Sequence, residues 1–250
     1  MFRDRQDAGQ KLGASLERLQ LQDPIVLALP RGGVPVAAEV AKVLKAPLDL
    51  VIVRKVGAPG NPELAVAAIV DGDPPDVVLN REIVEAYALG DSALRGLIAQ
   101  ERPELERRRV VYRGKDLPLS VAGKTVVIVD DGAATGTTMK VAIRALKRRS
   151  PRKVIVALPV APPETVDELA QEADLTICIN QPARFRALSY YYGSFPQLSD
   201  SEVLDMMALA RGDRRSNEEE GVPVRASPIN RGAKPALKAG RVKKDSRGLL

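Results

Sequence analysis

The sequence predicts an α/β fold in which a central, mostly parallel sheet carries helices on both faces. Two observations predict it. Short apolar runs recur along the chain and alternate with segments of helical spacing, which is the rhythm of βαβ units. The run at 126–129 is continuously apolar, as in a strand buried on both faces. The expected strands lie at 25–29, 48–53, 126–129, 153–159 and 175–179.

The first expected strand, 25–29, leads through a tight corner into an expected helix at 34–44. The corner contains Arg31, Gly32 and Gly33. Two glycines beside a basic residue expose backbone amides next to a positive charge, which suits a pyrophosphate group. Two glycines at a strand end are also typical of a plain turn, so both interpretations stay open at this point.

The expected strand at 48–53 ends at two basic residues, Arg54 and Lys55. The Gly- and Pro-rich stretch 56–63 follows, and we expect an irregular loop there because Gly and Pro interrupt regular structure. A long loop at a ligand-binding edge often acts as a lid, with Lys55 and Arg54 near a phosphate. The alternative is a solvated basic turn.

The segment 102–113 is rich in arginine and is interpreted as a helix. Glu104 stands three and four residues before Arg107 and Arg108, a spacing at which the side chains pair on a helix surface. Most of this helix is therefore expected to be a solvated, salt-bridged face.

The most informative segment joins the apolar run 126–129 to an expected helix at 140–149. Asp130 and Asp131 follow the run, and carboxylates at a strand end accept hydrogen bonds from vicinal ribose hydroxyls. The loop after them is made of small residues and threonines, which let a phosphate approach the backbone at a helix N-terminus. Its residues are Gly132, Ala133, Ala134, Thr135, Gly136, Thr137 and Thr138.

Two other interpretations of this segment are less satisfactory. A structural turn with a capped helix explains a lone Gly-Thr-Thr, but it leaves the paired acids unexplained. A Walker A loop requires four residues between its glycines and a Lys before the Ser or Thr. Here three residues separate Gly132 from Gly136, and Thr137 follows directly, which excludes an ordinary nucleotide triphosphatase.

The same segment resembles the signature of the type I phosphoribosyltransferases: a hydrophobic strand, two acids, a variable pair, then Ala- or Asp-Thr-Gly. The resemblance implies the type I fold, with a small hood and a flexible lid loop. It implies that Asp130 and Asp131 hold the ribose of 5-phosphoribosyl pyrophosphate (PRPP) and that residues 132–138 cradle its 5′-phosphate. It also implies that residues 31–33 bind the pyrophosphate. Ala134 stands where 6-oxopurine members carry Asp, which disfavours hypoxanthine and guanine as acceptors.

A second resemblance is to an uncharacterised subgroup of this family. It rests on the N-terminal pattern of Phe2, Asp4, Arg5, Ala8 and Gly9, and on Glu-Leu-x-Arg-Arg in the basic helix. In that subgroup the basic helix lies in the insertion near the lid, here about residues 54–115. The resemblance implies a phosphate-binding role for Arg107 and Arg108.

The acceptor would be bound by a hood formed from the N-terminal and C-terminal parts of the domain. The chain has only three Phe and five Tyr, and they concentrate at Phe2 and at 190–195. We expect Phe2, Tyr191 and Phe195 to stack on a planar base, although three consecutive tyrosines also suit an edge strand. The stretch 196–200 is expected to be a turn and N-cap that leads into a last helix at 202–210.

Several absences from the sequence restrict the chemistry. The chain has no His, which excludes a Ser-His-Asp triad and imidazole metal ligation. Its one cysteine, Cys178, lies in an apolar run and is expected to be a core residue. No apolar stretch approaches the roughly 18 residues that span a membrane, and the N-terminal ten residues lack a hydrophobic signal core. A cytoplasmic protein is expected.

The domain organisation predicted from composition is a phosphoribosyltransferase domain at 1–211 and a basic, low-complexity tail at 212–250 that we expect to be disordered. The tail holds ten basic and five acidic residues, so it carries most of the chain's net charge of +6. The remaining +1 on residues 1–211 gives no electrostatic reason to expect nucleic-acid binding.

The expected activity is that of a pentosyl glycosyltransferase that moves 5-phosphoribosyl from PRPP to a small, nitrogenous acceptor and releases pyrophosphate. Mg²⁺ is the expected cofactor and would be held mainly by pyrophosphate and ribose oxygens of PRPP, as Mg²⁺ commonly meets phosphate substrates. No metal site built from His or Cys is expected. The alternative is a non-catalytic regulatory protein that senses PRPP or a nucleotide on the same fold. No membrane partner is expected, and a homodimer is left open.

Overall fold

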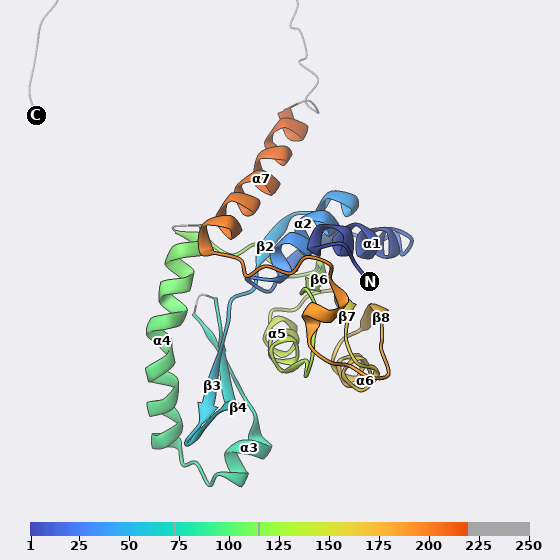
Figure 1. Cartoon of the computed structure of the whole chain (residues 1–250). Helices are drawn as coiled ribbons and strands as arrows, with labels where there is room; N and C mark the ends of the chain where they lie inside the picture. Colours follow the sequence, from blue (N-terminus) through green and yellow to red (C-terminus); the bar gives the residue numbers. More distant parts are fainter. Residues whose placement is uncertain (73, 115, 220–250) are drawn as a thin grey trace, which may run out of the picture.

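The computed structural model describes residues 1–72, 74–114 and 116–219. Its centre is a five-stranded sheet with the strand order β2-β1-β6-β7-β8, in which every neighbouring pair is parallel (Figure 1). The α/β fold expected from the apolar runs is therefore confirmed. The strands are β1 (Pro24–Ala28), β2 (Leu48–Leu50), β6 (Thr125–Val129), β7 (Lys153–Val160) and β8 (Leu175–Asn180).

The central strands are buried on both faces because consecutive side chains point to opposite sides of the sheet. In β6, Val127 and Val129 enter one hydrophobic cluster, whereas Val126 and Ile128 enter another. Helices α1 (Arg5–Glu17) and α2 (Gly33–Leu44) pack on the first cluster. Helices α5 (Thr137–Lys147) and α6 (Pro163–Glu172) pack on the second. Two covered faces explain why the sequence of β6 shows no polar alternation.

Strand β8 is an edge strand and is less buried than the run at 175–179 suggested. Cys178, expected in the core, is half-buried and packs against the second cluster. It is a free thiol whose Sγ contacts the Asn180 carbonyl oxygen at 3.3 Å, and burial raises its pKa to about 11.

Residues 53–113 form a second unit, which we call the arm; Figure 1 shows it extending from the central sheet. It contains an antiparallel sheet with the order β3-β4-β5 and the long helix α4, which packs on β3 and β4. The bounds are β3 (Val53–Ala58), β4 (Asn61–Val70), β5 (Asp76–Leu79), α3 (Arg81–Ala86) and α4 (Asp91–Arg113). The predicted helix at 102–113 is the second half of α4.

The prediction of an irregular loop at 56–63 is wrong, because this stretch belongs to the hairpin of β3 and β4. Its glycines mark special positions of the hairpin. Gly60 has φ of 75° in the turn, and the pairing register shifts on either side of Gly57. A Cβ atom on Gly57 would lie 2.6 Å from the Pro62 Cα, so the two strands approach too closely for a side chain.

A buried ion-pair network fastens the arm to the central sheet. Arg113, at the end of α4, donates to Asp49 of β2 at 2.7 Å and to Asp71, which follows β4, at 2.6 Å. All three side chains are at most 4% exposed. Arg113 also donates to the Leu50 carbonyl oxygen. Each charge is therefore paired, as burial requires.

The hood, residues 181–199, covers the end of the central sheet and is joined to the N-terminus. The Phe2 amide donates to the Tyr191 carbonyl, and the Gly193 amide donates to the Phe2 carbonyl, each at 2.8 Å. The edge strand considered for the tyrosines is not formed: Leu188–Tyr191 is the 3-10 helix η1, and Tyr192 makes an isolated bridge with Phe2.

The last helix, α7 (Asp200–Glu219), follows the hood and extends beyond the predicted 202–210. The Ser199 Oγ accepts from the Glu202 amide, and the Glu202 carboxylate accepts from the Ser199 amide at 2.7 Å. This reciprocal capping confirms the predicted turn and N-cap. Helix α7 thus runs past the proposed domain boundary at 211, while 220–250 of the expected tail lie outside the described residues.

Candidate functional site

The corner at 30–33 and the aspartate pair meet at the carboxyl edge of the central sheet. Strands β1 and β6 are neighbours, and the Leu29 amide donates to the Val129 carbonyl at 3.0 Å. A Cβ atom on Gly33 would lie 2.7 Å from the Val129 carbonyl oxygen and 2.9 Å from the Asp130 Cα. Only glycine allows this approach, so residues separated by about a hundred positions form one surface. The Pro30–Arg31 peptide is cis.

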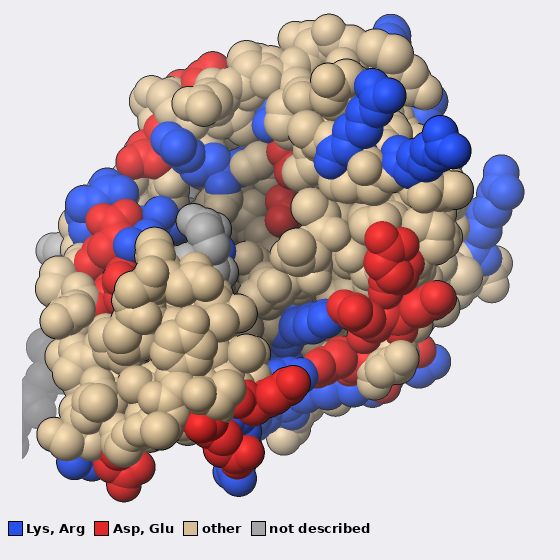
Figure 2. Space-filling model, turned by 60° about the horizontal axis from the view of Figure 1, so that its bottom comes forward, with Lys and Arg blue, Asp and Glu red and all other residues tan. Residues whose placement is uncertain are grey.

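Figure 2 shows a hollow between two lobes of the molecule. Acidic atoms lie in the depth of the hollow, and basic side chains, with some acidic ones among them, lie around it. Such an arrangement suits a polar sugar that carries anionic groups at its ends.

The loop at 132–138 turns sharply into α5. Gly132 has φ of 153°, and a Cβ atom there would lie 2.8 Å from the Val160 carbonyl oxygen. Gly136 has φ of 65° and directly precedes the first residue of α5. These two positions therefore require glycine.

Polar groups remain accessible along this loop. Thr135 is exposed, Thr137 and Thr138 are half-exposed, and the hydroxyls of Thr135 and Thr137 lie 3.2 Å apart. The Ala134 carbonyl is turned away, because it accepts from the Thr165 hydroxyl at 2.8 Å. Hydroxyls and helix N-terminal amides on one loop form a suitable anion-binding surface.

Asp131 is buried and tied to the hood. Arg5 of α1 donates from Nε to its Oδ2 at 2.8 Å, and both side chains are 10% exposed. Arg5 also donates to the Pro196 carbonyl at 2.8 Å and stacks 3.7 Å from the ring centroid of Phe195. The Tyr192 hydroxyl donates to the Asp131 carbonyl at 2.5 Å. Asp131 thus anchors the hood over the sheet.

Asp130 is half-buried and lacks an arginine partner among the described ion pairs. Its Oδ1 accepts from the Asp131 amide at 2.8 Å. Burial, and then the charge of Asp131, raise the pKa of Asp130 well above its usual value. Burial also raises the pKa of Asp131, but Arg5 works against that rise. The two acids are therefore not equivalent, and Asp130 is the one that gains from a ligand supplying hydrogen-bond donors.

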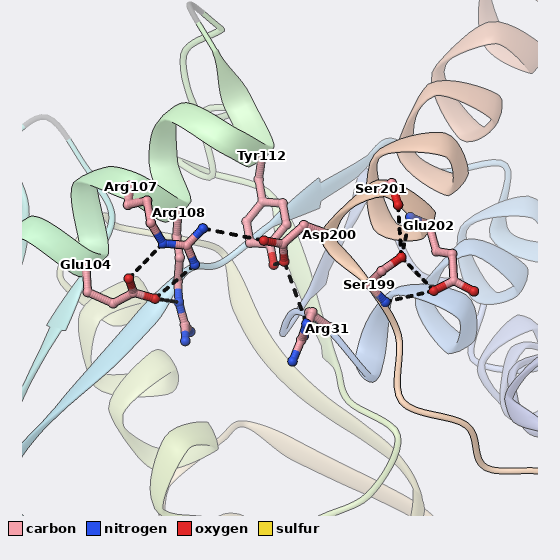
Figure 3. A network of polar contacts seen from close by, with 9 residues as sticks. All are labelled: Arg31, Glu104, Arg107, Arg108, Tyr112, Ser199, Asp200, Ser201 and Glu202. Atoms are coloured by element: carbon pink, nitrogen blue, oxygen red, sulfur yellow. Dashed lines mark hydrogen bonds and ion pairs between the residues drawn. The ribbon is translucent and has the colours of Figure 1, made fainter.

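A cluster of charged residues lies beside the corner, where α4 meets the start of α7 (Figure 3). Asp200 accepts from the Tyr112 hydroxyl at 2.5 Å, and lies 3.4 Å from Arg107 and 3.9 Å from Arg31. Tyr112 foremost, and then Arg107, lower the pKa of Asp200. We call Arg31, Arg107, Tyr112 and Asp200 the arginine cluster.

Glu104 forms the ion pairs that its spacing from Arg107 and Arg108 predicted, and so holds both arginines at the arginine cluster. Its carboxylate accepts from Arg107 at 2.8 Å and from Arg108 at 2.9 Å. Hydrogen bonds from Arg107 and Arg108 lower the pKa of Glu104 to about 2. Arg107 and Arg108 therefore face the same region as Arg31 but are already partly neutralised.

The other predicted site residues are distributed between the arm and the hood. Lys55 lies on β3 and is half-buried. Arg54, next to it, donates to Glu101 of α4 at 2.6 Å, so its charge is used within the arm. Phe2 is 5% exposed and packs against Tyr192 at 5.5 Å between ring centroids, which leaves little ring surface for a ligand.

A pocket of about 500 Å³ opens between the loop at 132–138 and the hood. Tyr191 is not among the lining residues; its ring stacks on Phe185, at 5.5 Å between centroids. Of the three aromatics proposed for stacking, Phe195 lines this pocket directly. The lining residues are Arg5, Ala134, Phe185, Arg186, Ala187, Leu188, Ser189, Phe195, Pro196 and Gln197.

Sequence reasoning missed three residues of the site: Arg5, Tyr192 and Asp200. Arg5 was visible as part of the N-terminal Phe-x-Asp-Arg pattern, but its partner stands 126 residues away. Asp200 was visible only as a helix start. The described residues contain no group of three or more His, Cys, Asp or Glu that could hold a metal ion. No helix among them has the length and apolar character needed to cross a membrane.

Comparisons with known proteins agree with this geometry. The family model described as "Phosphoribosyl transferase domain" matches residues 6–186. Two curated relatives from Mycobacterium tuberculosis, named "Putative phosphoribosyl transferase MT0597" and "Putative phosphoribosyl transferase Rv0571c", are each 41% identical over 244 residues. The match covers 97% of this chain and 54% of each relative, so the chain spans about half their length.

A solved structure with a similar fold is that of TT1426 from Thermus thermophilus. It is 42% identical, with a TM-score of 0.72, and the match covers 82% of this chain and 97% of that chain. The sequence signature, the strand order and these comparisons lead to one conclusion. The chain belongs to the phosphoribosyl transferase family and has the type I fold.

Proposed function

We propose that the chain transfers 5-phosphoribosyl from PRPP to a nitrogenous acceptor and releases pyrophosphate. The observation that carries the proposal is the contact between the corner at 30–33 and Asp130, with the loop at 132–138 beside them. PRPP has a phosphate at one end, a diol in the middle and a pyrophosphate at the other side. The loop at 132–138, Asp130 and the corner at 30–33 have the chemical character that suits these three groups in turn.

Each part of the substrate is assigned to one surface. The hydroxyls and amides of 132–138 bind the 5′-phosphate. Asp130 accepts hydrogen bonds from the ribose hydroxyls, which relieves its unfavourable burial. Arg31, with the amides of Gly32 and Gly33, binds the pyrophosphate, and Lys55, Arg107 and Arg108 add positive charge at its outer side.

The reaction then depends mainly on orientation and charge. The bond between the anomeric carbon and the pyrophosphate oxygen breaks, and the pyrophosphate leaves with the electron pair. The acceptor nitrogen donates its lone pair to the anomeric carbon, and the proton that this nitrogen carries passes to the leaving pyrophosphate or to water. Because the transition state resembles an oxocarbenium ion, no strong side-chain base is required, and neutralising the leaving group is the larger task. Arg31 performs that task within this chain.

Mg²⁺ is proposed as the cofactor. The described residues offer no three-carboxylate cage, but Mg²⁺ is commonly bound by one or two carboxylates together with substrate phosphates. Asp130 is the half-buried carboxylate that fits this donor set, with the remaining ligands coming from PRPP and water. When bound, the ion would neutralise part of the pyrophosphate charge.

The experiment is to follow pyrophosphate release from PRPP and Mg²⁺ across a panel of nitrogenous bases. We expect release with at least one base, and we expect Asp130→Asn to lose it. Asp167→Asn is the matched control, because Asp167 is exposed on α6, outside the candidate site. Turnover in Asp130→Asn equal to that of the wild type would refute the ribose contact. Thermal stabilisation by PRPP with no release for any base would instead support the regulatory alternative.

A further inference from the structure

We propose that the acceptor is a planar ring bearing a carboxylate or a similar anionic group, bound in the hood pocket with its anion at Arg186. That this ligand is the acceptor of the transfer rests on the proposed function. The preference of the pocket for such a ring rests on the pocket alone.

The position of the pocket favours an acceptor site. Ala134 of the loop at 132–138 forms part of its wall, so the pocket is continuous with the surface that would hold the sugar phosphate. Its volume of about 500 Å³ lies within the usual range for small-molecule sites. A small acceptor in the pocket would therefore be a neighbour of the bound sugar.

The walls of the pocket favour a planar ring. Phe185 and Phe195 both line it, and each ring contacts a tyrosine ring that is not among the lining residues. Phe185 stacks on Tyr191 with 23° between the ring planes, and Phe195 lies 4.8 Å from Tyr192 between ring centroids. Arg5 already lies over Phe195, 3.7 Å from its ring centroid, so Phe185 is the aromatic side chain on which a planar ring would stack, and Phe195 adds apolar contact beside it.

The charges of the pocket favour an anion. Its lining contains two arginines, Arg5 and Arg186, and no acidic residue. Arg5 is neutralised by Asp131 at 2.8 Å and donates a second hydrogen bond to a hood carbonyl. No described carboxylate pairs with Arg186, which is exposed and whose guanidinium carbon lies 5.4 Å from the ring centroid of Tyr190. One uncompensated positive charge thus stands at the pocket.

The remaining polar groups do not offset this preference. Ser189 and Gln197 line the pocket and can donate or accept hydrogen bonds with neutral groups. A cationic ring would be repelled by Arg186 and would find no carboxylate in the pocket lining to pair with. A carboxylate would form a charge-assisted and potentially bidentate contact with the guanidinium.

The test measures binding of matched pairs of rings that differ in an anionic group: nicotinate against nicotinamide, and orotate against uracil. Ligand-observed NMR titrations are run on the full chain, with and without PRPP and Mg²⁺. We expect the anionic member of at least one pair to bind on the order of tenfold more tightly. Equal or weaker binding of both anionic members would overturn the inference.

Variants locate the effect. Arg186→Gln is expected to remove the preference for the anionic ring, and Arg186→Lys to retain part of it. Arg184→Gln is the matched control, because Arg184 is an exposed hood arginine outside the pocket lining. A preference that survives Arg186→Gln would overturn the assignment to Arg186.

A thermal unfolding measurement with PRPP, run beside the titrations, separates this inference from the proposed function. If PRPP fails to stabilise the wild-type protein against heating, the phosphoribosyl transfer proposed above fails. The titrations without PRPP still decide whether the pocket selects anionic rings. If PRPP stabilises the protein but the paired rings bind equally, the transfer proposal stands and the acceptor inference fails.

Discussion

Two charge clusters flank the candidate site, and they are built in opposite ways. In the first, Arg5 and Asp131 meet at 2.8 Å with both side chains 10% exposed. In the second, the arginine cluster, Arg31 approaches Asp200 only to 3.9 Å, with side chains 50% and 35% exposed. Removing one partner of a buried ion pair costs much folding free energy, whereas an exposed ion pair contributes little to it. The first cluster is therefore a fixed framework, and the second can exchange partners.

This difference matches what the proposed transfer from PRPP would require at each end of that substrate. The sugar would have to be held in one orientation, which a rigid framework under the hood provides. The pyrophosphate would arrive and leave in every cycle, so the cations assigned to it would need partners that they release easily. Asp200 is suited to be such a partner for Arg31 and Arg107 while no substrate is bound.

The largest effect is expected from breaking the framework. Arg5→Met leaves the Asp131 carboxylate buried without its counter-charge and should cost about 3–5 kcal/mol of folding free energy, measured by urea denaturation. Arg3→Met is the control, because Arg3 is 79% exposed and its buried partner Asp7 keeps a second cation, Lys11, at 2.8 Å. It should cost less than about 1 kcal/mol. Similar stabilities for Arg5→Met and Arg3→Met would contradict the distinction.

The next largest effect concerns the contact between the two loops. Gly33→Ala places a methyl group 2.7 Å from the Val129 carbonyl oxygen, so it should cost about 1–3 kcal/mol and abolish thermal stabilisation by PRPP. Gly96→Ala is the matched control. Gly96 lies within α4 with nothing within 4 Å of an added Cβ, and the change should stabilise the protein by about 0.5–1 kcal/mol. Undiminished PRPP stabilisation in Gly33→Ala would argue against the assigned corner.

A smaller effect, of opposite sign, is expected at the carboxylate without an arginine. Burial raises the pKa of Asp130 in the folded protein above the ordinary value of 3.8, so the unfolded chain ionises first and Asp130 destabilises the fold as pH rises from about 4 through its raised pKa. Asp130→Asn should therefore raise the melting temperature at neutral pH by a few degrees and flatten that part of the pH profile. A lower melting temperature for Asp130→Asn at pH 7 would show that ionised Asp130 stabilises the fold.

The smallest effect is expected in the arginine cluster. Asp200→Asn should change stability by less than about 1 kcal/mol and should tighten PRPP binding, because the arginines lose a competing anion. Burial, with the bond to Asp200, raises the pKa of Tyr112 to about 12. This pKa should fall in the variant, as read by ultraviolet absorbance during alkaline titration. Weaker PRPP binding would show that Asp200 assists the substrate.

The comparison also explains how far the sequence alone could predict the structure. The central sheet and both loops follow from local patterns, because the apolar run in β6 and the acid pair after it are contiguous in the chain. The pairing of Arg5 with Asp131 depends on folding across 126 residues, and no local pattern encodes it. The hairpin at 53–70 was misjudged because Gly57 and Gly60, typical of loops, here serve a close strand approach and a turn.

The join between Phe2 and the hood has a consequence for biosynthesis. The amide of Phe2 needs the carbonyl of Tyr191, and Ser194 needs the carbonyl of Arg3, so these bonds span almost the whole described domain. A growing polypeptide emerges from the ribosome with its first residues long before their partners exist. The hood therefore joins the N-terminus only late in synthesis, after residues 191–194 have emerged.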